Sequence, residues 1–189
     1  MEVIELIKTG LENVKRSIDR TLKGLTPAEL RWQPRPDANS IGLILFHIAR
    51  SEDAFIQSLL QDKSQLWESE KWYQKFNKAI DDRGGHYTAE QVAAFVVPDM
   101  KDLRGYIEAV HKNTLEYLKK LTPGKLDKKV DLPPMGPPPK DSPGGKPEQP
   151  KRLPFEPTVG AMLLMTVTHA AQHAGEISYL RGLQRGMDK

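Results

Sequence analysis

Two histidines four residues apart carry the clearest chemical signal in the sequence. His169 and His173 lie in a segment with helical periodicity, so their side chains share one face and are one turn apart. Two imidazoles at this spacing can bind one metal ion, although two unrelated helical histidines would have the same spacing. The intervening Ala170 and Gln172 exclude the H-E-x-x-H pattern of zinc metalloproteases, which places a glutamate base directly after the first histidine.

Two features of the surroundings favour a shared metal ion for this pair. Both histidines lie on a helical stripe with Met162 and Thr166, which predicts that the imidazoles point inward. Burying two imidazoles without partners is unfavourable, and one ion would satisfy both. His47 lies in a second apolar run, where a lone histidine is more often a hydrogen-bonded core residue. Facing the pair from another helix, His47 would complete a three-histidine site.

The carboxylates near these histidines allow several roles. Glu176 comes three residues after His173, so it could orient a ligand histidine, act as a catalytic base, be a fourth ligand or lie in solvent. Glu52 comes five residues after His47, so its side chain turns away and is expected to be exposed. Two further histidines have polar neighbours and are predicted to lie at the surface: His86 and His111.

Three neutral imidazole ligands would leave the charge of a divalent ion uncompensated and one coordination position open, as in catalytic sites. Such an ion lowers the pKa of a bound water or thiol. The chain contains no cysteine, so a thiol nucleophile would have to be a low-molecular-weight cosubstrate. All-imidazole ligation suits Zn, Ni or Fe, and also Cu.

Four helical segments are predicted to position these residues. Apolar residues recur every three or four positions along 4–25, 41–61, 92–118 and 162–180. Thr26, Ser40, Thr88 and Thr158 precede helical segments as capping residues. Pro98 should kink or split the third helix, which is expected to open at Thr88. The predicted fold class is all-α, a four-helix bundle with one long connection between its third and fourth helices.

The long connection, residues 123–157, is rich in proline. Eleven of the 15 prolines lie in it, which excludes regular secondary structure over most of its length. A loop of this length in a compact domain is functional or disordered. Because the segment enters directly before the helix of His169, we consider it a lid within a single domain spanning residues 1–189.

The composition excludes several classes of function. The chain has 189 residues, enough for one core, and its 28 Lys and Arg exceed its 25 Asp and Glu by only three. This margin is too small for the basic surface of a nucleic-acid-binding protein. The longest nearly apolar stretch, residues 159–167, is too short to cross a membrane. We therefore expect a cytoplasmic protein that binds neither nucleic acid nor membrane.

The sequence resembles the DinB superfamily, the YfiT-like metal proteins rather than the DNA polymerase that shares the name. The resemblance rests on Trp-Gln-Pro at 32–34, on residues 39–52 around His47 and on residues 168–177, and it covers nearly the whole chain in element order. It implies a four-helix bundle in which three histidines bind a divalent metal, here His47, His169 and His173. Relatives often carry Arg before the glycine of the last motif and Gln after it, where this chain has Ala174 and Glu176.

The resemblance also implies a class of reaction. Characterised relatives include S-transferases that use bacillithiol, glutathione or mycothiol, and a mycothiol-dependent maleylpyruvate isomerase. We therefore expect a metal-dependent enzyme that activates a thiol cosubstrate or water against a small-molecule substrate, as an S-transferase or a hydrolase. The alternative is a metal-binding or stress-response bundle without catalysis. The resemblance further suggests a homodimer.

A group of aromatic residues follows the second predicted helix: Trp67, Trp72, Tyr73 and Phe76. These side chains could form the wall of a substrate pocket. We favour the simpler interpretation that they pack the connection between the second and third helices onto the bundle.

Overall fold

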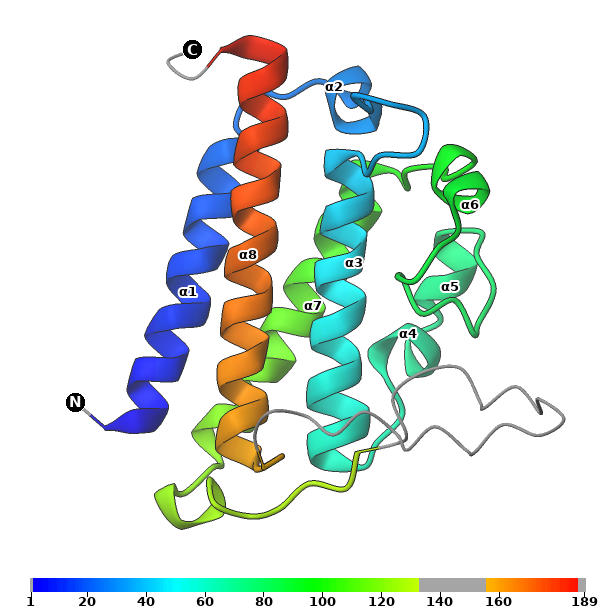
Figure 1. The fold of residues 1–189 in the computed structure, drawn as a ribbon. Coiled ribbons are helices and arrows are strands. Elements are labelled where there is room, and N and C mark those ends of the chain that lie inside the picture. The colour runs from blue at the N-terminus through cyan, green and yellow to red at the C-terminus, as the bar shows by residue number, and fades with distance from the viewer. Residues whose placement is uncertain (1, 133–155, 187–189) are drawn as a thin grey trace, which may run out of the picture.

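Four long helices form a bundle in the structure, a computed structural model that describes residues 2–132 and 156–186. Figure 1 shows these helices, which are α1 (Val3–Leu22), α3 (Ile41–Asp53), α7 (Met100–Lys119) and α8 (Val159–Arg185). Helix α8 packs between α1 and α3, and α7 packs against α3. The predicted all-α four-helix bundle is therefore confirmed. Within the described ranges, β pairing is limited to one isolated bridge between Lys129 and Thr158.

The helix that carries His47 does not end as a regular α-helix. A π-helical segment, η1 (Ala54–Leu59), continues α3 directly, with wider turns than the helix before it. Together α3 and η1 occupy the length predicted for the second long helix, 41–61. Such π-helical insertions are frequent at functional sites, and Phe55 of η1 has its ring edge toward the ring of His169, with centroids 6.1 Å apart.

Capping residues set the helix starts where the sequence predicts them. The Ser40 hydroxyl accepts a hydrogen bond from the main-chain nitrogen of Leu43 at 3.2 Å and opens α3. The Thr158 hydroxyl does the same for Ala161 at 3.2 Å and opens α8. These caps satisfy main-chain donors that have no partner within the first turn. They fix the two helices that carry the three histidines.

The third long helix begins later than expected. The predicted capping box at Thr88 forms, but the helix that it opens, α6 (Ala89–Ala93), is only five residues long. The long helix α7 starts after Asp99, whose side chain accepts from the main-chain nitrogen of Lys101 at 2.8 Å. Pro98 explains the break, because it lacks an N–H donor and disfavours helical dihedrals in the residue before it. Pro98 thus splits this segment rather than kinking it.

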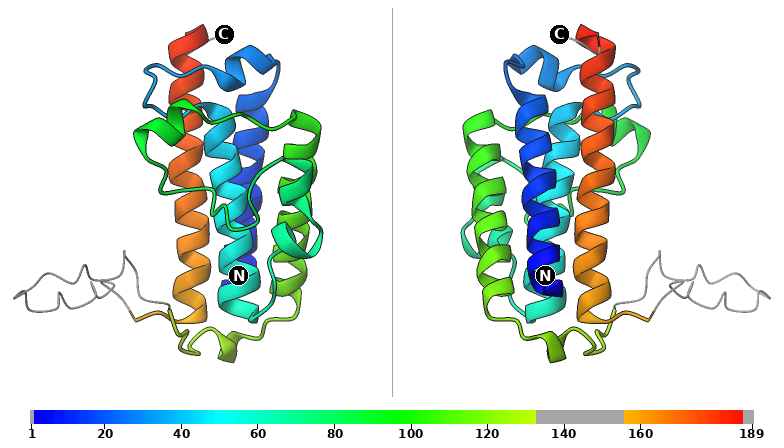
Figure 2. Two further views of the ribbon diagram at one scale, coloured as in Figure 1. Left: turned by 90° about the vertical axis from the view of Figure 1, so that its right-hand side faces the viewer. Right: turned by 90° about the vertical axis from the view of Figure 1, so that its left-hand side faces the viewer.

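Short helices and their connections cover α3 on one side of the bundle (Figure 2): α4 (Leu66–Ser69), α5 (Trp72–Lys75) and α6. Trp67, Trp72 and Phe76 are buried and pack in edge-to-face and tilted contacts around Phe46 of α3 and Tyr106 of α7. The aromatic residues therefore fasten this connection to the bundle, as predicted. A further short helix, α2 (Pro27–Arg31), lies between α1 and α3, and the 3-10 turn η2 (Pro123–Lys125) follows α7.

The two ends of the proline-rich connection meet beside the start of α8. The main-chain nitrogen of Val130 donates to the oxygen of Pro157 at 2.7 Å, and that of Val159 donates to the oxygen of Lys128 at 2.9 Å. The proposed lid falls mainly on residues 133–155, which lie outside the described residues.

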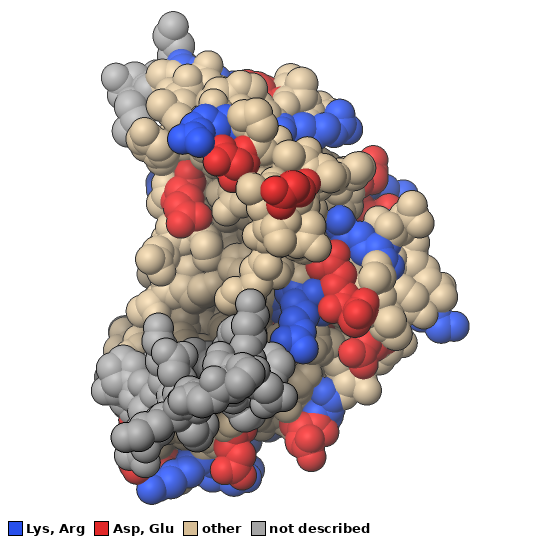
Figure 3. Space-filling model, turned by 45° about the vertical axis from the view of Figure 1, so that its right-hand side comes forward, with Lys and Arg blue, Asp and Glu red and all other residues tan. Residues whose placement is uncertain are grey.

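Charged side chains of both signs are interspersed on the face shown in Figure 3, around a hollow bordered by uncharged residues. Among the described helices, none combines the length and the hydropathy needed to cross a membrane.

Candidate metal centre

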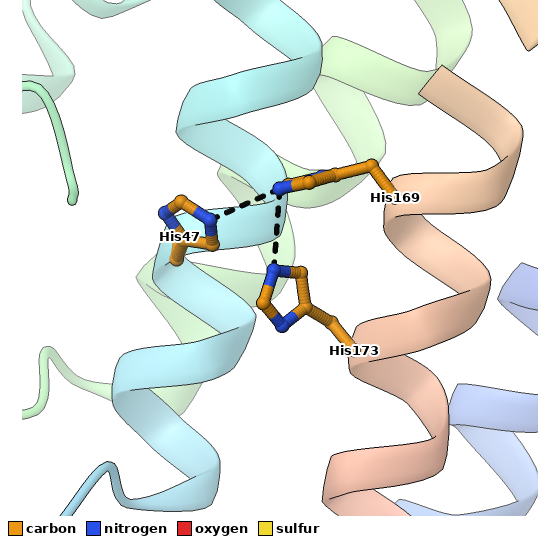
Figure 4. Close-up of side chains that lie close together, drawn as sticks. All are labelled: His47, His169 and His173. Atoms are coloured by element: carbon orange, nitrogen blue, oxygen red, sulfur yellow. Dashed lines mark hydrogen bonds between the residues drawn. The ribbon is translucent and has the colours of Figure 1, made fainter. Parts of the chain in front are cut away.

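The three predicted ligands come together between α3 and α8 (Figure 4). The Nε2 atom of His169 lies 3.1 Å from Nε2 of His47 and 3.2 Å from Nε2 of His173. One ring nitrogen from each of the three residues lies within 4.8 Å of the others. In the part of the chain that the structure describes, this is the group of His, Cys, Asp or Glu side chains that could hold a metal ion.

Hydrogen bonds on the far side of two rings set their tautomers. Nδ1 of His47 lies 2.8 Å from the main-chain oxygen of Gly84, and Nδ1 of His173 lies 2.7 Å from Oε2 of Glu176. A carbonyl or carboxylate oxygen only accepts, so Nδ1 is the protonated nitrogen in both rings. Each Nε2 therefore keeps its lone pair and directs it into the cluster. Proteins commonly orient metal-binding histidines in this way.

The donor set fits a divalent metal ion. Nitrogens about 2.0–2.1 Å from a tetrahedral zinc ion would be separated by about 3.3 Å, close to the two short distances in the cluster. Burial, together with the neighbouring imidazoles of His173 and His47, lowers the pKa of His169 to about 4. Burial also lowers the pKa of His47, although its hydrogen bond to Gly84 opposes this effect. Both rings are therefore neutral near pH 7, as metal binding requires.

A glycine turn closes over the outer side of His47. Gly84 has a φ of 70°, a left-handed conformation that other residues adopt at a cost. A Cβ atom on Gly85 would lie 2.8 Å from Nδ1 of His47, closer than side-chain atoms normally approach. The sequence Gly84-Gly85 thus allows the main chain to lie against the imidazole and to accept a hydrogen bond from its Nδ1. The Gly-Gly pair is the one sequence signal for this close approach, and spacing along the chain does not link it to His47.

Arg50, one turn after His47, fastens this turn to the bundle. It is buried, and its Nε and Nη2 donate to the main-chain oxygen of Asp82 at 3.1 and 2.9 Å. The Asp82 carboxylate in turn accepts from the main-chain nitrogen of Gly84 at 2.8 Å. A chain of contacts therefore runs from Arg50 through Asp82 to the carbonyl that orients His47.

The charge of Arg50 is balanced inside the bundle. Its Nη1 donates to Gln65 at 2.6 Å and to the Tyr106 hydroxyl at 3.1 Å, and lies 3.7 Å from Oδ2 of Asp53. Asp53 also accepts from the main-chain nitrogens of Leu66 and Trp67. Burial raises the pKa of Asp53, while these hydrogen bonds and Arg50 lower it. The network joins α3, α7 and the segment after η1 around one buried ion pair.

The three imidazoles point toward one another between α3 and α8, near one side of the bundle. All three side chains are partly exposed, and α7 lies behind α3 when the cluster is viewed from the front (Figure 4). The cluster therefore lies between α3 and α8, on the side of α3 away from α7, and its side chains are partly accessible to solvent.

The positions of the other residues singled out in the sequence agree with the predictions only in part. Glu176 contacts His173 on the ring edge opposite the cluster, which corresponds to the orienting role among the four considered. His86 is exposed, as predicted. Two predictions of exposure are wrong: the side chains of Glu52 and His111 are only 12% and 14% exposed. Glu52 does turn away from His47, but the opposite side of α3 faces the interior of the bundle rather than solvent.

Comparison with known proteins agrees with this architecture. The crystal structure of a conserved protein from Enterococcus faecalis superposes with a TM-score of 0.76 at 26% sequence identity, and 97% of each chain is covered. No curated protein matches the chain. Residues 11–177 match the sequence model of the DinB superfamily, a range that contains all three clustered histidines and most of each long helix. The chain therefore belongs to the DinB superfamily.

Proposed function

We propose that His47, His169 and His173 bind one divalent metal ion and that the protein uses it to activate a small thiol or water for reaction with a small-molecule substrate. The observation that carries this proposal is the convergence of three Nε2 atoms, two of them with tautomers set by partners outside the cluster. Two unrelated helical histidines would not share such an arrangement with a third from another helix.

The ligand number favours a catalytic over a structural site. Structural zinc sites have four protein ligands, whereas catalytic sites have three and keep a position open. The candidate group contains three side chains within the described ranges, and all three are partly exposed. A divalent ion bound by three neutral ligands would supply positive charge that lowers the pKa of a coordinated thiol or water.

The protein's own residues would orient and support this site. Gly84 and Glu176 accept hydrogen bonds from Nδ1 of His47 and His173, so Nε2 of each ring would be the nitrogen that binds the metal. Glu176 is partly exposed and carries a carboxylate 2.7 Å from Nδ1 of His173, so it would also stabilise positive charge on that ring. Phe55 packs against His169 and would shield one side of the cluster from water.

The thiol version of the reaction needs a cosubstrate, since the chain has no cysteine. The thiol sulfur would form a bond to an electrophilic carbon, the leaving group would depart with the electrons of the broken bond, and the thiol proton would pass to solvent. In the hydrolase version, water would take the place of the thiol. The family to which the chain belongs supports either chemistry, and the partial exposure of all three histidines would let a small reactant approach the ion.

Spectroscopy of the cobalt-substituted protein tests the proposal. We expect glutathione, as a representative thiol, to produce a sulfur-to-cobalt charge-transfer band, and S-methylglutathione to produce none. The His169→Ala variant should lose the band, whereas His86→Ala, which removes an exposed histidine outside the cluster, should keep it. A cobalt-loaded protein that gives no band with the thiol and hydrolyses no ester substrate would contradict the proposed chemistry.

A further inference from the structure

A cavity of about 270 Å³ lies inside the bundle, between α1, α3 and α7. Its walls are mainly aliphatic, with contributions from Val14 and Ile18 of α1, Ile48 of α3 and Ile107 of α7. Ala170 of α8 also lines it. Cavities in bundle cores, lined by apolar side chains and a few polar groups, are common sites for small ligands.

This cavity is separate from the metal centre. On α3, the cavity is lined by Leu45, Ile48 and Glu52, whereas His47 faces the seam with α8. At 3.6 residues per turn, Leu45 and Glu52 lie roughly 140–160° around the helix from His47. The body of α3 therefore stands between the two places, and a ligand in the cavity would not contact the histidine cluster.

A single carboxyl group lies deep in this apolar space. Oε1 of Glu52 accepts a hydrogen bond from the Thr114 hydroxyl at 2.6 Å and lies 3.9 Å from Nδ1 of His111. Within the described residues, no hydrogen-bond partner is recorded for Oε2. Burial raises the pKa of Glu52 to about 7, because the protein supplies only one hydrogen bond to compensate for lost water. A cation placed beside this carboxylate would therefore restore a favourable interaction.

The other charged groups facing the cavity lie near its mouth and largely cancel. On α1, Lys15 pairs with Asp19 at 2.6 Å. On α7, Arg104 and Glu108 are one turn apart and both exposed, and burial lowers the pKa of His111, so that ring is neutral near pH 7. Glu52 is thus the innermost charged group of the cavity.

We propose that this cavity binds an amphipathic amine, a primary ammonium group on a short hydrocarbon body, with the ammonium against Glu52 and the hydrocarbon along the aliphatic walls. The ammonium can donate to Oε2 of Glu52, while the body removes apolar surface of α1, α3 and α7 from water. The proposal is independent of the proposed metal chemistry, since the two sites share no residue.

Three probes with the same hydrocarbon chain test the proposal: n-hexylamine, 1-hexanol and hexanoate. Binding is measured at pH 8 by calorimetry, or by NMR shifts of the Ile and Val methyl groups. We expect hexylamine to bind at least about tenfold more tightly than hexanol, as a charge-assisted hydrogen bond would give. Hexanoate should bind most weakly, because its carboxylate would face Glu52. Hexylamine that binds no better than hexanol, or not at all, would overturn the proposal.

Variants identify the group responsible. Glu52→Gln should abolish the preference for hexylamine and leave hexanol binding unchanged. Glu108→Gln, which removes an exposed carboxylate at the mouth of the same cavity, should change hexylamine affinity by less than about threefold, because solvent screens that charge. Unchanged hexylamine affinity in Glu52→Gln would contradict the assigned site.

Two further measurements remove ambiguity. If Glu52→Gln does not fold, the pH dependence of binding to the wild-type protein tests the same point. Hexylamine affinity should fall about tenfold from pH 8 to pH 5 as Glu52 becomes protonated, whereas hexanol affinity should not change. An amine affinity that stays constant over this range would overturn the proposal. Hexylamine should bind His169→Ala as it binds the wild type, so failure of the metal centre and failure of the amine site are distinguishable.

Discussion

The imidazole of His47 donates a hydrogen bond from Nδ1 to the main-chain oxygen of Gly84, 2.8 Å away and 37 residues later in the sequence. This contact leaves Nε2 of His47 free to face Nε2 of His169. A turn that contributes no side chain to the cluster therefore controls the direction of one ligand.

Substitution of Gly85 should weaken metal binding without unfolding the protein. In Gly85→Ala the new Cβ would lie 2.8 Å from Nδ1 of His47, so the ring must shift and its hydrogen bond to Gly84 lengthens. We expect affinity for zinc to fall about 10–100-fold, as when outer partners of metal ligands are lost. Competitive titration with a chelating indicator measures this change. Gly124→Ala is the matched control, since its Cβ meets no atom within 4 Å, and equal losses in both variants would contradict the prediction.

Glu176 should act on the metal centre through His173. Glu176→Ala removes the acceptor of the Nδ1 proton, so we expect zinc affinity to fall about tenfold. Glu176→Gln keeps an acceptor oxygen but loses the charge, and its affinity should lie between those of wild type and Glu176→Ala. Gln172→Ala, an exposed substitution on the same helix, serves as control. The same titration measures all three, and wild-type affinity in Glu176→Ala would contradict the orienting role.

Arg50 should matter mainly for stability. Arg50→Met leaves Asp53 buried without its cationic partner and releases the oxygen of Asp82. Loss of one partner from a buried ion pair typically costs about 3–5 kcal/mol in the free energy of unfolding. Arg31→Met, an exposed change, should cost less than about 0.5 kcal/mol. Urea denaturation compares the two, and similar stabilities would show that the network contributes little.

The raised pKa of Glu52 predicts a pH dependence of stability. The folded chain keeps the Glu52 proton up to about pH 7, whereas the unfolded chain releases it near the ordinary value of 4.5. The stabilising contribution is therefore complete below pH 4.5 and is lost as pH rises through 7, with a total of about 3 kcal/mol. Glu52→Gln lacks this titration. Between pH 4.5 and pH 8, the free energy of unfolding in urea should fall more for wild type than for the variant. Equal decreases in the two proteins would contradict the raised pKa of Glu52.

The sequence alone was sufficient to predict the helices and site residues that have strong local patterns. Helical periodicity and side-chain caps at Ser40 and Thr158 located α3 and α8, and the spacing of His169 and His173 fixed their shared face. His47 was identified as a third candidate from its apolar context and from the family resemblance. These features depend on residues close in sequence, which is why a pattern could reveal them.

The supporting residues were harder to predict because their roles depend on contacts between distant segments. The partner of His47 is a main-chain carbonyl, and any residue has one, so only the unusual pair Gly84-Gly85 gave a signal. Arg50 lies in an apolar run, yet its burial depends on Asp82, Gln65 and Tyr106. Helical spacing correctly turned Glu52 away from the metal centre but could not show that this side faces a cavity.

The metal content of the purified protein tests the central claim most directly. After incubation with zinc and removal of excess metal, elemental analysis of wild type and of His86→Ala should give one ion per chain. Nε2 of His169 lies 3.1 Å from that of His47 and 3.2 Å from that of His173. The His169→Ala variant should therefore contain close to no metal while remaining helical by circular dichroism. Equal metal content in wild type and a folded His169→Ala would contradict the three-histidine site.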